Sequence, residues 1–278
     1  MINQSCSKHL FTLKHIVKLS LQKMGINVLN RRESEAFLQS GVKEICARWN
    51  QEEVPPGLKR YVYSNFQSSR AQLQQDLVAQ YLSENLACEH RFFVEFGATD
   101  GVTLSNSHFL EAHGWRGVLV EPDVNWHSEL EKNRKNQIDK RCVYSESGLE
   151  IEFINSAIGE LSGVKIHASH DGWGLTRANG TTSTVETVSL QDLLVEYEAP
   201  RRINYLSIDT EGSEFEIIKD FDFHKWDVVF VSIEHNFGDN QAKIDKKMEE
   251  NEYVRVLETI SAWDAWYIKN EYLTEIFR

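Results

Sequence analysis

The sequence lacks the features of secreted, membrane-spanning and disordered proteins. Its four cysteines form no closely spaced pair, which favours free thiols in a reducing compartment. No apolar run approaches the ~18 residues that cross a bilayer, and lysines interrupt the apolar residues near the start, unlike a secretory signal. Only 4 prolines and 15 glycines among 278 residues argue against long disordered linkers. We therefore expect a cytoplasmic globular protein.

Positive charge is scarce and unevenly placed. The chain has 42 Asp and Glu against 30 Lys and Arg, a net charge of -12. Residues 1–32 carry six basic and no acidic side chains, so the other residues sum to -18. We expect no nucleic-acid partner, because an acidic body repels phosphates. The basic leader could contact an anionic membrane surface, so peripheral membrane association through residues 1–32 is an alternative to packing on the protein.

Two helices are expected before the main domain. Apolar residues recur at helical spacing over 10–24, and a second helix is expected over 35–49, followed by the breaker Pro55-Pro56-Gly57. The length suits one large domain with an extension. We predict a helical N-terminal extension over residues 1–65 and an α/β domain over residues 66–278.

Helical and buried-strand patterns alternate in the rest of the chain. Helices are expected over residues 71–86, 102–113, 125–136, 188–197 and 242–250, and strands over 92–96, 117–120, 141–144, 203–208 and 228–233. This alternation predicts a doubly wound Rossmann-like sheet, with an antiparallel hairpin over 253–260 and 265–268 at its end. Such sheets bind ligands at the carboxyl ends of their strands.

The first predicted strand runs into a glycine-punctuated loop. The spacing Gly97-x-x-x-Gly101 differs from the G-x-G-x-x-G of dinucleotide sites, and the loop lacks the Gly-Lys-Ser/Thr of a P-loop. The second strand ends in Glu121, 20 residues beyond Gly101, where a carboxylate can accept both hydroxyls of an adenosine ribose. These features favour a nucleoside ligand without phosphates, such as S-adenosylmethionine, over NAD or ATP.

Acidic side chains also follow the later strands. Asp209 and Glu211 come after residues 203–208, and Glu234 and His235 follow at the end of the next strand. A single acid at such a position could be a helix cap. Several carboxylates crowded at one sheet edge repel one another and raise one another's pKa, which favours a functional site.

Several motifs occur in the order of one known family. They are Gln74-Gln75-Asp76, Phe93–Gly101, Leu104–Asn106, Leu110–Glu111, Gly114–Pro122, Ile208–Glu214 and Val231–Asn236. Together they resemble the FkbM-type methyltransferases over about residues 66–260. The resemblance implies a class I methyltransferase that uses S-adenosylmethionine, most often an O-methyltransferase acting on sugar or polyketide hydroxyls.

The resemblance also implies residue roles. The cofactor-binding residues carried over are Glu95, Phe96, Gly97, Ala98, Asp100, Gly101, Glu121, Pro122, Cys142, Val143 and Asp209. Among them, Cys142 and Val143 would flank the adenine, although the family more often has Ala-Leu there.

Asp209 and His235 are the candidate bases for taking the acceptor's hydroxyl proton, with Glu211 as a further catalytic candidate. A purely structural His235 is equally compatible with the pattern. A divalent cation held by Asp209, Glu211, Glu234 and His235 is an alternative that the family signature does not require, so we predict no metal.

Other functions stay open on the sequence alone. An NAD-dependent oxidoreductase of similar fold is disfavoured by the glycine spacing, and a non-catalytic relative could bind a partner. The acceptor is expected to be a small molecule or glycan. Residues 161–184, which include His167, His170 and Asp171, are expected to form a substrate loop. The sequence does not indicate an oligomeric state.

Overall fold

A computed structural model describes residues 43, 45–155, 162–164, 181–236, 238 and 240–276. The chain divides into two compact units, residues 1–69 and 70–278. In the first unit, residues 45–49 are helical and α3 (Pro56–Asn65) begins with a proline at its first turn, where no backbone N–H is needed. The helix expected over 10–24 lies outside the described residues. Within those ranges, no helix is long and apolar enough to cross a membrane.

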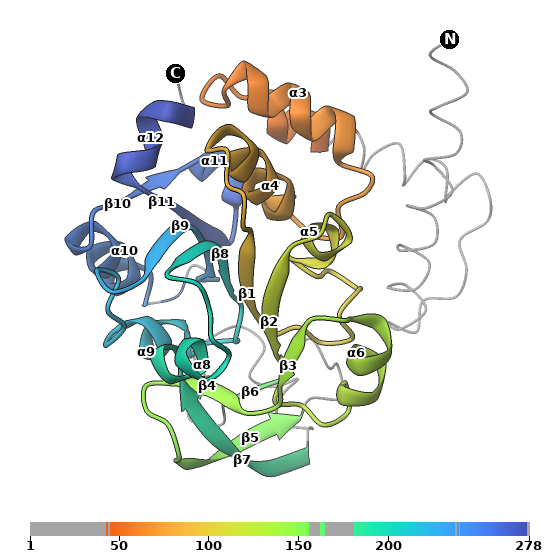
Figure 1. Ribbon diagram of the computed structural model, residues 1–278, viewed down its shortest axis with the longest axis vertical. Helices are drawn as coiled ribbons and strands as arrows, with labels where there is room; N and C mark the ends of the chain where they lie inside the picture. Colours follow the sequence, from red (N-terminus) through yellow and green to blue (C-terminus); the bar gives the residue numbers. More distant parts are fainter. Residues whose placement is uncertain are drawn as a thin grey trace. The chain divides into compact units, whose positions relative to one another are not determined.

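The second unit is built around a seven-stranded mixed sheet (Figure 1) of order β10-β11-β9-β8-β1-β2-β3. Its strands are β1 (Phe92–Phe96), β2 (Arg116–Val120), β3 (Gln137–Asp139), β8 (Arg202–Ile208), β9 (Asp227–Glu234), β10 (Tyr253–Val256) and β11 (Asp264–Lys269). Five neighbouring strands of this sheet run parallel, namely β3, β2, β1, β8 and β9. Strand β11 is antiparallel to both of its neighbours, β9 and β10. This mixed α/β sheet is consistent with the predicted Rossmann-like fold.

Short helices connect the strands. They are α4 (Gln75–Asn85), α5 (His108–Ala112), α6 (His127–Asn133), α8 (Leu190–Glu196), α9 (Glu214–Ile218), α10 (Gln241–Glu250), α11 (Glu258–Ser261) and α12 (Asn270–Ile276). Ser189 caps α8: its hydroxyl accepts a hydrogen bond from the N–H of Asp192 at 3.1 Å.

Both faces of the sheet are buried, and β1 is buried at every residue. Val94 and Phe96 belong to a core cluster with α8, α9 and α10. Phe93, which lies between Phe92 and Val94 in β1, is in register with Tyr205 of β8, and Tyr205 is in register with Phe230 of β9. The rings of Tyr205 and Phe230 stack with their centroids 5.2 Å apart. Because successive residues of a strand point to opposite faces, the nearly continuous apolar runs of β1 and β8 fit a sheet covered on both sides.

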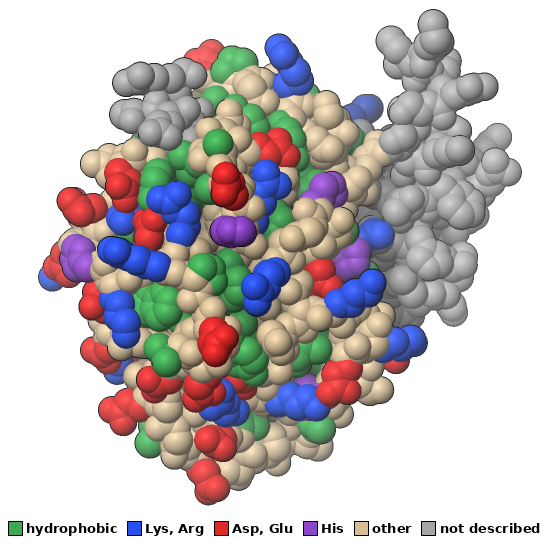
Figure 2. Space-filling model, in the orientation of Figure 1, with side chains coloured by type: hydrophobic (Ala, Val, Ile, Leu, Met, Phe, Trp, Pro, Cys, Tyr) green, Lys and Arg blue, Asp and Glu red, His purple; other side chains and the backbone are tan. Residues whose placement is uncertain are grey.

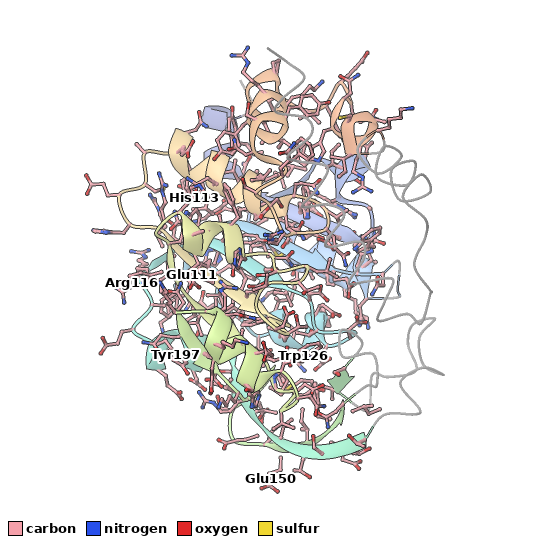
Figure 3. The ribbon with its side chains drawn as sticks, turned by 90° about the vertical axis from the view of Figure 1, so that its right-hand side faces the viewer. Glu111, His113, Arg116, Trp126, Glu150 and Tyr197 are labelled. Carbon is pink, nitrogen blue, oxygen red and sulfur yellow. The ribbon has the colours of Figure 1, made fainter. Side chains whose placement is uncertain are left out.

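A second sheet has the order β4-β7-β5-β6 and consists of β4 (Cys142–Tyr144), β5 (Glu150–Asn155), β6 (Gly163–Val164) and β7 (Thr181–Ser189). In Figure 3 it lies below α6, where Glu150 marks the start of β5 and Trp126 precedes α6. The prediction that 141–144 form the third strand of the main sheet was wrong. The preceding residues 137–139 take that place, and β4 pairs with β7.

Other predicted boundaries also shift. The helix expected over 102–113 begins only at His108, because Asp100 turns the chain by accepting hydrogen bonds from the N–H groups of Val102 and Thr103. The strand expected over 253–260 ends at Val256 and gives way to α11. The expected substrate loop contains β6 and the start of β7, while its two histidines and Asp171 lie outside the described residues.

Charges of both signs are interspersed over the face shown in Figure 2. Exposed pairs such as Lys140–Glu131, at 2.6 Å, are screened by water and contribute little to stability. The buried residues on the two faces of the main sheet therefore carry most of the stability of this unit.

Candidate active site

A cavity of about 460 Å³ opens at the carboxyl edge of the parallel strands. This volume falls within the roughly 300–1,000 Å³ of small-molecule sites. Of the residues predicted for the site, Glu95, Phe96, Gly97, Glu121, Pro122, Cys142, Val143, Asp209 and Glu211 line the cavity. The other predicted site residues, Ala98, Asp100, Gly101 and His235, do not.

Glu121 follows β2 and is only 4% exposed. Its Oε2 accepts a hydrogen bond from the N–H of Thr99 at 2.7 Å, and its Oε1 accepts one from the N–H of Asp123 at 2.8 Å. Burial raises the pKa of Glu121 to about 7, while the two backbone donors act in the opposite direction. Each carboxylate oxygen keeps further lone pairs, so Glu121 is a fixed acceptor in the cavity wall.

The loop after β1 approaches its neighbours too closely for a side chain at Gly97. This residue has a φ of +75°, and an added Cβ would lie 2.1 Å from the backbone oxygen of Asp209. The N–H of Gly97 donates to the carbonyl of Val120 at 3.1 Å. Glycine here lets the backbone, rather than a side chain, form this part of the cavity wall.

Unfavourable backbone conformations gather around the cavity. Thr99, Leu104, Glu211 and Asn236 all line it and all have positive φ angles, between 43° and 58°. Residues other than glycine adopt this region at an energetic cost, and such residues cluster at ligand sites. The strain therefore supports a functional role for this edge of the sheet.

Glu95 lines the cavity, but its carboxylate is held by internal partners. It accepts hydrogen bonds from the hydroxyls of Ser105 and Ser107 and, at 2.6 Å, from the N–H of Asn106. Arg134 lies 3.5 Å away and is itself 1% exposed. Glu95 thus fixes the segment after the glycine loop, and its predicted contact with the cofactor stays a prediction.

Arg134 is a structural residue that sequence reasoning missed. Its guanidinium donates to Glu111 at 2.8 Å, to the carbonyl of Gly101 at 3.0 Å and to the hydroxyl of Ser107 at 2.8 Å. An added Cβ at Gly101 would lie 2.5 Å from the Arg134 side chain. Gly101, which packs against Arg134, and the turn-forming Asp100 therefore fix the conformation of the loop and do not line the cavity.

An apolar side of the cavity is formed by Cys142 and Val143 together with Phe153 and Val164. All four are buried, and burial raises the pKa of the Cys142 thiol to about 12. The thiol is therefore neutral at physiological pH and behaves as a small apolar group. This surface suits a flat aromatic ring such as adenine.

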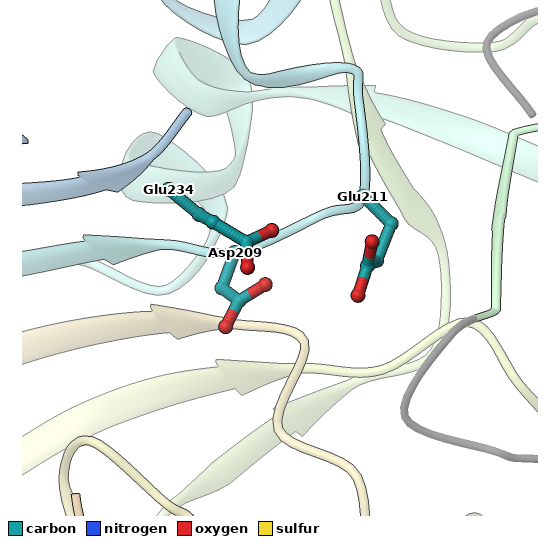
Figure 4. Close-up of side chains that lie close together, drawn as sticks. All are labelled: Asp209, Glu211 and Glu234. Atoms are coloured by element: carbon teal, nitrogen blue, oxygen red, sulfur yellow. The ribbon is translucent and has the colours of Figure 1, made fainter. Parts of the chain in front are cut away.

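Three carboxylates converge at the ends of β8 and β9 (Figure 4). One oxygen from each of Asp209, Glu211 and Glu234 lies within 4.8 Å of the others. Burial raises the pKa of Asp209 to about 6, and the nearby Glu95 adds to this rise. Burial and the surrounding carboxylates raise the pKa of Glu234 well above its usual value. The acids predicted to meet at this edge do so.

His235 is not among the residues that line the cavity. Its Nε2 lies 3.3 Å from the guanidinium of Arg255, on the side of β10. Burial and the positive charge of Arg255 lower the pKa of this histidine. Glu234, the last residue of β9, lines the cavity, whereas the next residue does not. The role of His235 as a base therefore stays a prediction.

Asp264 is a cavity residue that the sequence did not reveal. It is 6% exposed, lies opposite Glu234 in the β9–β11 pair, and its Oδ2 accepts hydrogen bonds from Gln75 and Trp266, both at 3.3 Å. Burial, with a contribution from Asp209, raises its pKa to about 8. The predicted hairpin was the signal that could have revealed Asp264. Because β11 is antiparallel to β9, its first residue lies at the sheet edge where β9 ends.

The parallel strands and the cavity at their carboxyl edge are consistent with a Rossmann-like enzyme domain. The particular family follows from the sequence, since residues 95–262 match the family model described as Methyltransferase FkbM domain. The match covers more than half of the chain, so the chain belongs to the FkbM methyltransferase family. No curated protein matches the chain.

Proposed function

We propose that the protein is an S-adenosylmethionine-dependent O-methyltransferase acting on a hydroxyl of a sugar, glycan or related natural product. Family membership supports methyl transfer. The observation that carries the choice of cofactor is the buried, backbone-fixed carboxylate of Glu121 in the wall of the cavity. Within the described lining there is no Lys, Arg or His, which disfavours ligands that present phosphates.

The lining fits the parts of S-adenosylmethionine in the order of the strands. Glu121 at the end of β2 offers acceptor lone pairs to the two ribose hydroxyls, and the apolar surface around Cys142 and Val143 suits the adenine. The Gly97 loop at the end of β1 comes next in the sheet and offers backbone groups to the amino-acid part. The ends of β8, β9 and the start of β11 are left for the acceptor.

When bound, S-adenosylmethionine supplies an electrophilic methyl group that a hydroxyl oxygen of the acceptor can take. The chain must then position that oxygen and accept its proton. Asp209 and Asp264 both line the acceptor end of the cavity and carry pKa values raised toward neutrality. These two carboxylates are the proposed proton acceptors, in place of the histidine.

Calorimetry on the purified chain tests the cofactor assignment. S-adenosylmethionine should bind the wild type, and Glu121→Ala should abolish detectable binding because the ribose loses its acceptor. Glu129→Ala, on the exposed side of α6, is the matched control and should bind like the wild type. Equal affinity in all three proteins would exclude our ribose site, and binding of NAD instead would favour an oxidoreductase.

A methyl-transfer assay tests the reaction. The protein is incubated with S-adenosylmethionine and panels of sugars, nucleotide sugars and hydroxylated natural products, and formation of S-adenosylhomocysteine is measured. We expect turnover with at least one hydroxylated acceptor and almost none in Asp264→Asn, which should still bind the cofactor. Full activity of this variant would remove Asp264 from the reaction.

A further inference from the structure

The acidic residues at the acceptor end of the cavity have an arrangement that proton transfer alone does not require. Asp209 follows β8, Glu211 lies in the turn after it, and Glu234 ends β9. Figure 4 shows their three carboxylates pointing toward one common region from different directions. One oxygen of each lies within 4.8 Å of the other two.

A second observation concerns Glu234 alone. Its Oε2 atom is buried and has no hydrogen-bond partner among the described residues. A buried carboxyl oxygen without a donor loses its hydration and gains no hydrogen bond in return, which is unfavourable. Such an oxygen is expected to meet a donor or a cation when the site is complete.

The other carboxylates of the cavity differ in this respect. Arg134 faces Glu95, and two backbone N–H groups hold Glu121. Gln75 and Trp266 donate to Asp264. The described lining supplies no Lys, Arg or His beside Glu234.

We propose that Asp209, Glu211 and Glu234 form a binding site for a divalent cation of the magnesium or calcium class. The ligands would be carboxylate oxygens only, which are the donors that these hard cations prefer. The cation would neutralise most of the charge of the trio and give Glu234 Oε2 its missing partner.

The spacing can be compared with the size of such ions. Three atoms no more than 4.8 Å apart share a point at most about 2.8 Å from each, which is 4.8 Å divided by √3. Calcium–oxygen distances are about 2.3–2.6 Å and magnesium–oxygen distances about 2.0–2.1 Å. Side-chain movements of a few tenths of an ångström therefore suffice for calcium, and slightly larger ones for magnesium. The remaining coordination positions would face the cavity.

The cation would also give the acceptor a point of attachment. A cation lowers the pKa of a coordinated hydroxyl and fixes the direction of its oxygen. This role rests on the proposed function, whereas the cation site itself does not. Asp264 lies outside the trio, so it remains available to take the proton.

Binding of Mn²⁺ to the full chain, without cofactor or acceptor, tests the proposal directly. The electron paramagnetic resonance signal of free Mn²⁺ should fall on addition of protein, and Mg²⁺ or Ca²⁺ should restore it by competition. Glu234→Gln should weaken Mn²⁺ binding by at least about tenfold, since even residues behind metal ligands are worth 10–100-fold. Glu211→Gln is the second variant, with the same expectation. Because neutralising one of several crowded carboxylates relieves repulsion, both variants should fold.

Asp264→Asn is the matched control, since it removes one cavity carboxylate outside the trio. It should keep Mn²⁺ affinity within about threefold of the wild type, whereas an equal loss would show that only the general negative potential attracts the ion. Glu121→Ala should bind Mn²⁺ normally while losing S-adenosylmethionine, which separates this proposal from the proposed function. Absence of Mn²⁺ binding, or unchanged binding in Glu234→Gln and Glu211→Gln, would overturn it.

Discussion

Binding of S-adenosylmethionine should depend on pH through Glu121. Burial raises the pKa of this carboxyl to about 7 in the ligand-free protein. Below that pH the group is mostly neutral, and it then accepts hydrogen bonds from ribose hydroxyls less well than the carboxylate does. Because the raised pKa belongs to an acid, the binding-competent charged form increases as pH rises and is complete above pH 8.

The loss of affinity at low pH can be calculated from the fraction of Glu121 that is ionised. At pH 6 about one tenth of Glu121 is ionised, so the apparent affinity should be about tenfold weaker than above pH 8. At pH 5 the loss should approach about a hundredfold, provided that the ligand keeps the group ionised. The same linkage requires release of nearly one proton for each cofactor bound at pH 6.

Calorimetry from pH 5 to 8.5, in two buffers of different ionisation enthalpy, measures both quantities. Glu121→Gln should bind more weakly, and whatever pH dependence it retains belongs to other groups such as Asp209 and Asp264. Affinity that is constant within threefold between pH 6 and 8 would refute the reasoning. The same slope in the wild type and in Glu121→Gln would refute it equally.

Three further predictions concern the supports of the site. His235→Ala should leave kcat within about threefold of wild type, because the ring lies outside the cavity lining; a hundredfold loss of kcat would restore it as a base. Gly97→Ala should lose cofactor binding and about 1–3 kcal/mol of stability, since its Cβ would overlap a backbone oxygen at 2.1 Å; unchanged calorimetry would contradict this. Arg134→Met should lower the free energy of unfolding in urea by about 3–5 kcal/mol, because the buried Glu95 loses its positively charged partner. A change below about 1 kcal/mol would show that the pair is not critical.

The parts of the fold that depend on local pattern could be predicted from the sequence. The apolar runs of β1 and β8 required burial on both faces, and each ended in the polar residues that the structure brings to the cavity. The glycine at 97 and the acid at 121 each had a recognisable position relative to a strand. The sequence also indicated the β10–β11 hairpin.

The missed features depend on tertiary contacts or on single-residue register. Arg134 could not be identified because its hydrogen-bond partners lie 23 to 33 positions earlier in the chain. The position of His235 outside the cavity lining could not be predicted, because it depends on how the chain turns directly after β9. The strand at 137–139 has only one fully buried residue, so it gave little signal beside the more apolar 142–144.

The hydrogen bond between Gln75 and Asp264 joins residues 189 positions apart. The chain reaches the outer strand β10 before it returns to place β11 beside β9. Contacts of such long sequence separation form slowly in folding, because a large loop must close first. The acceptor end of the cavity should therefore be completed after the cofactor end, and a chain interrupted before residue 264 would leave β9 as an exposed edge open to aggregation.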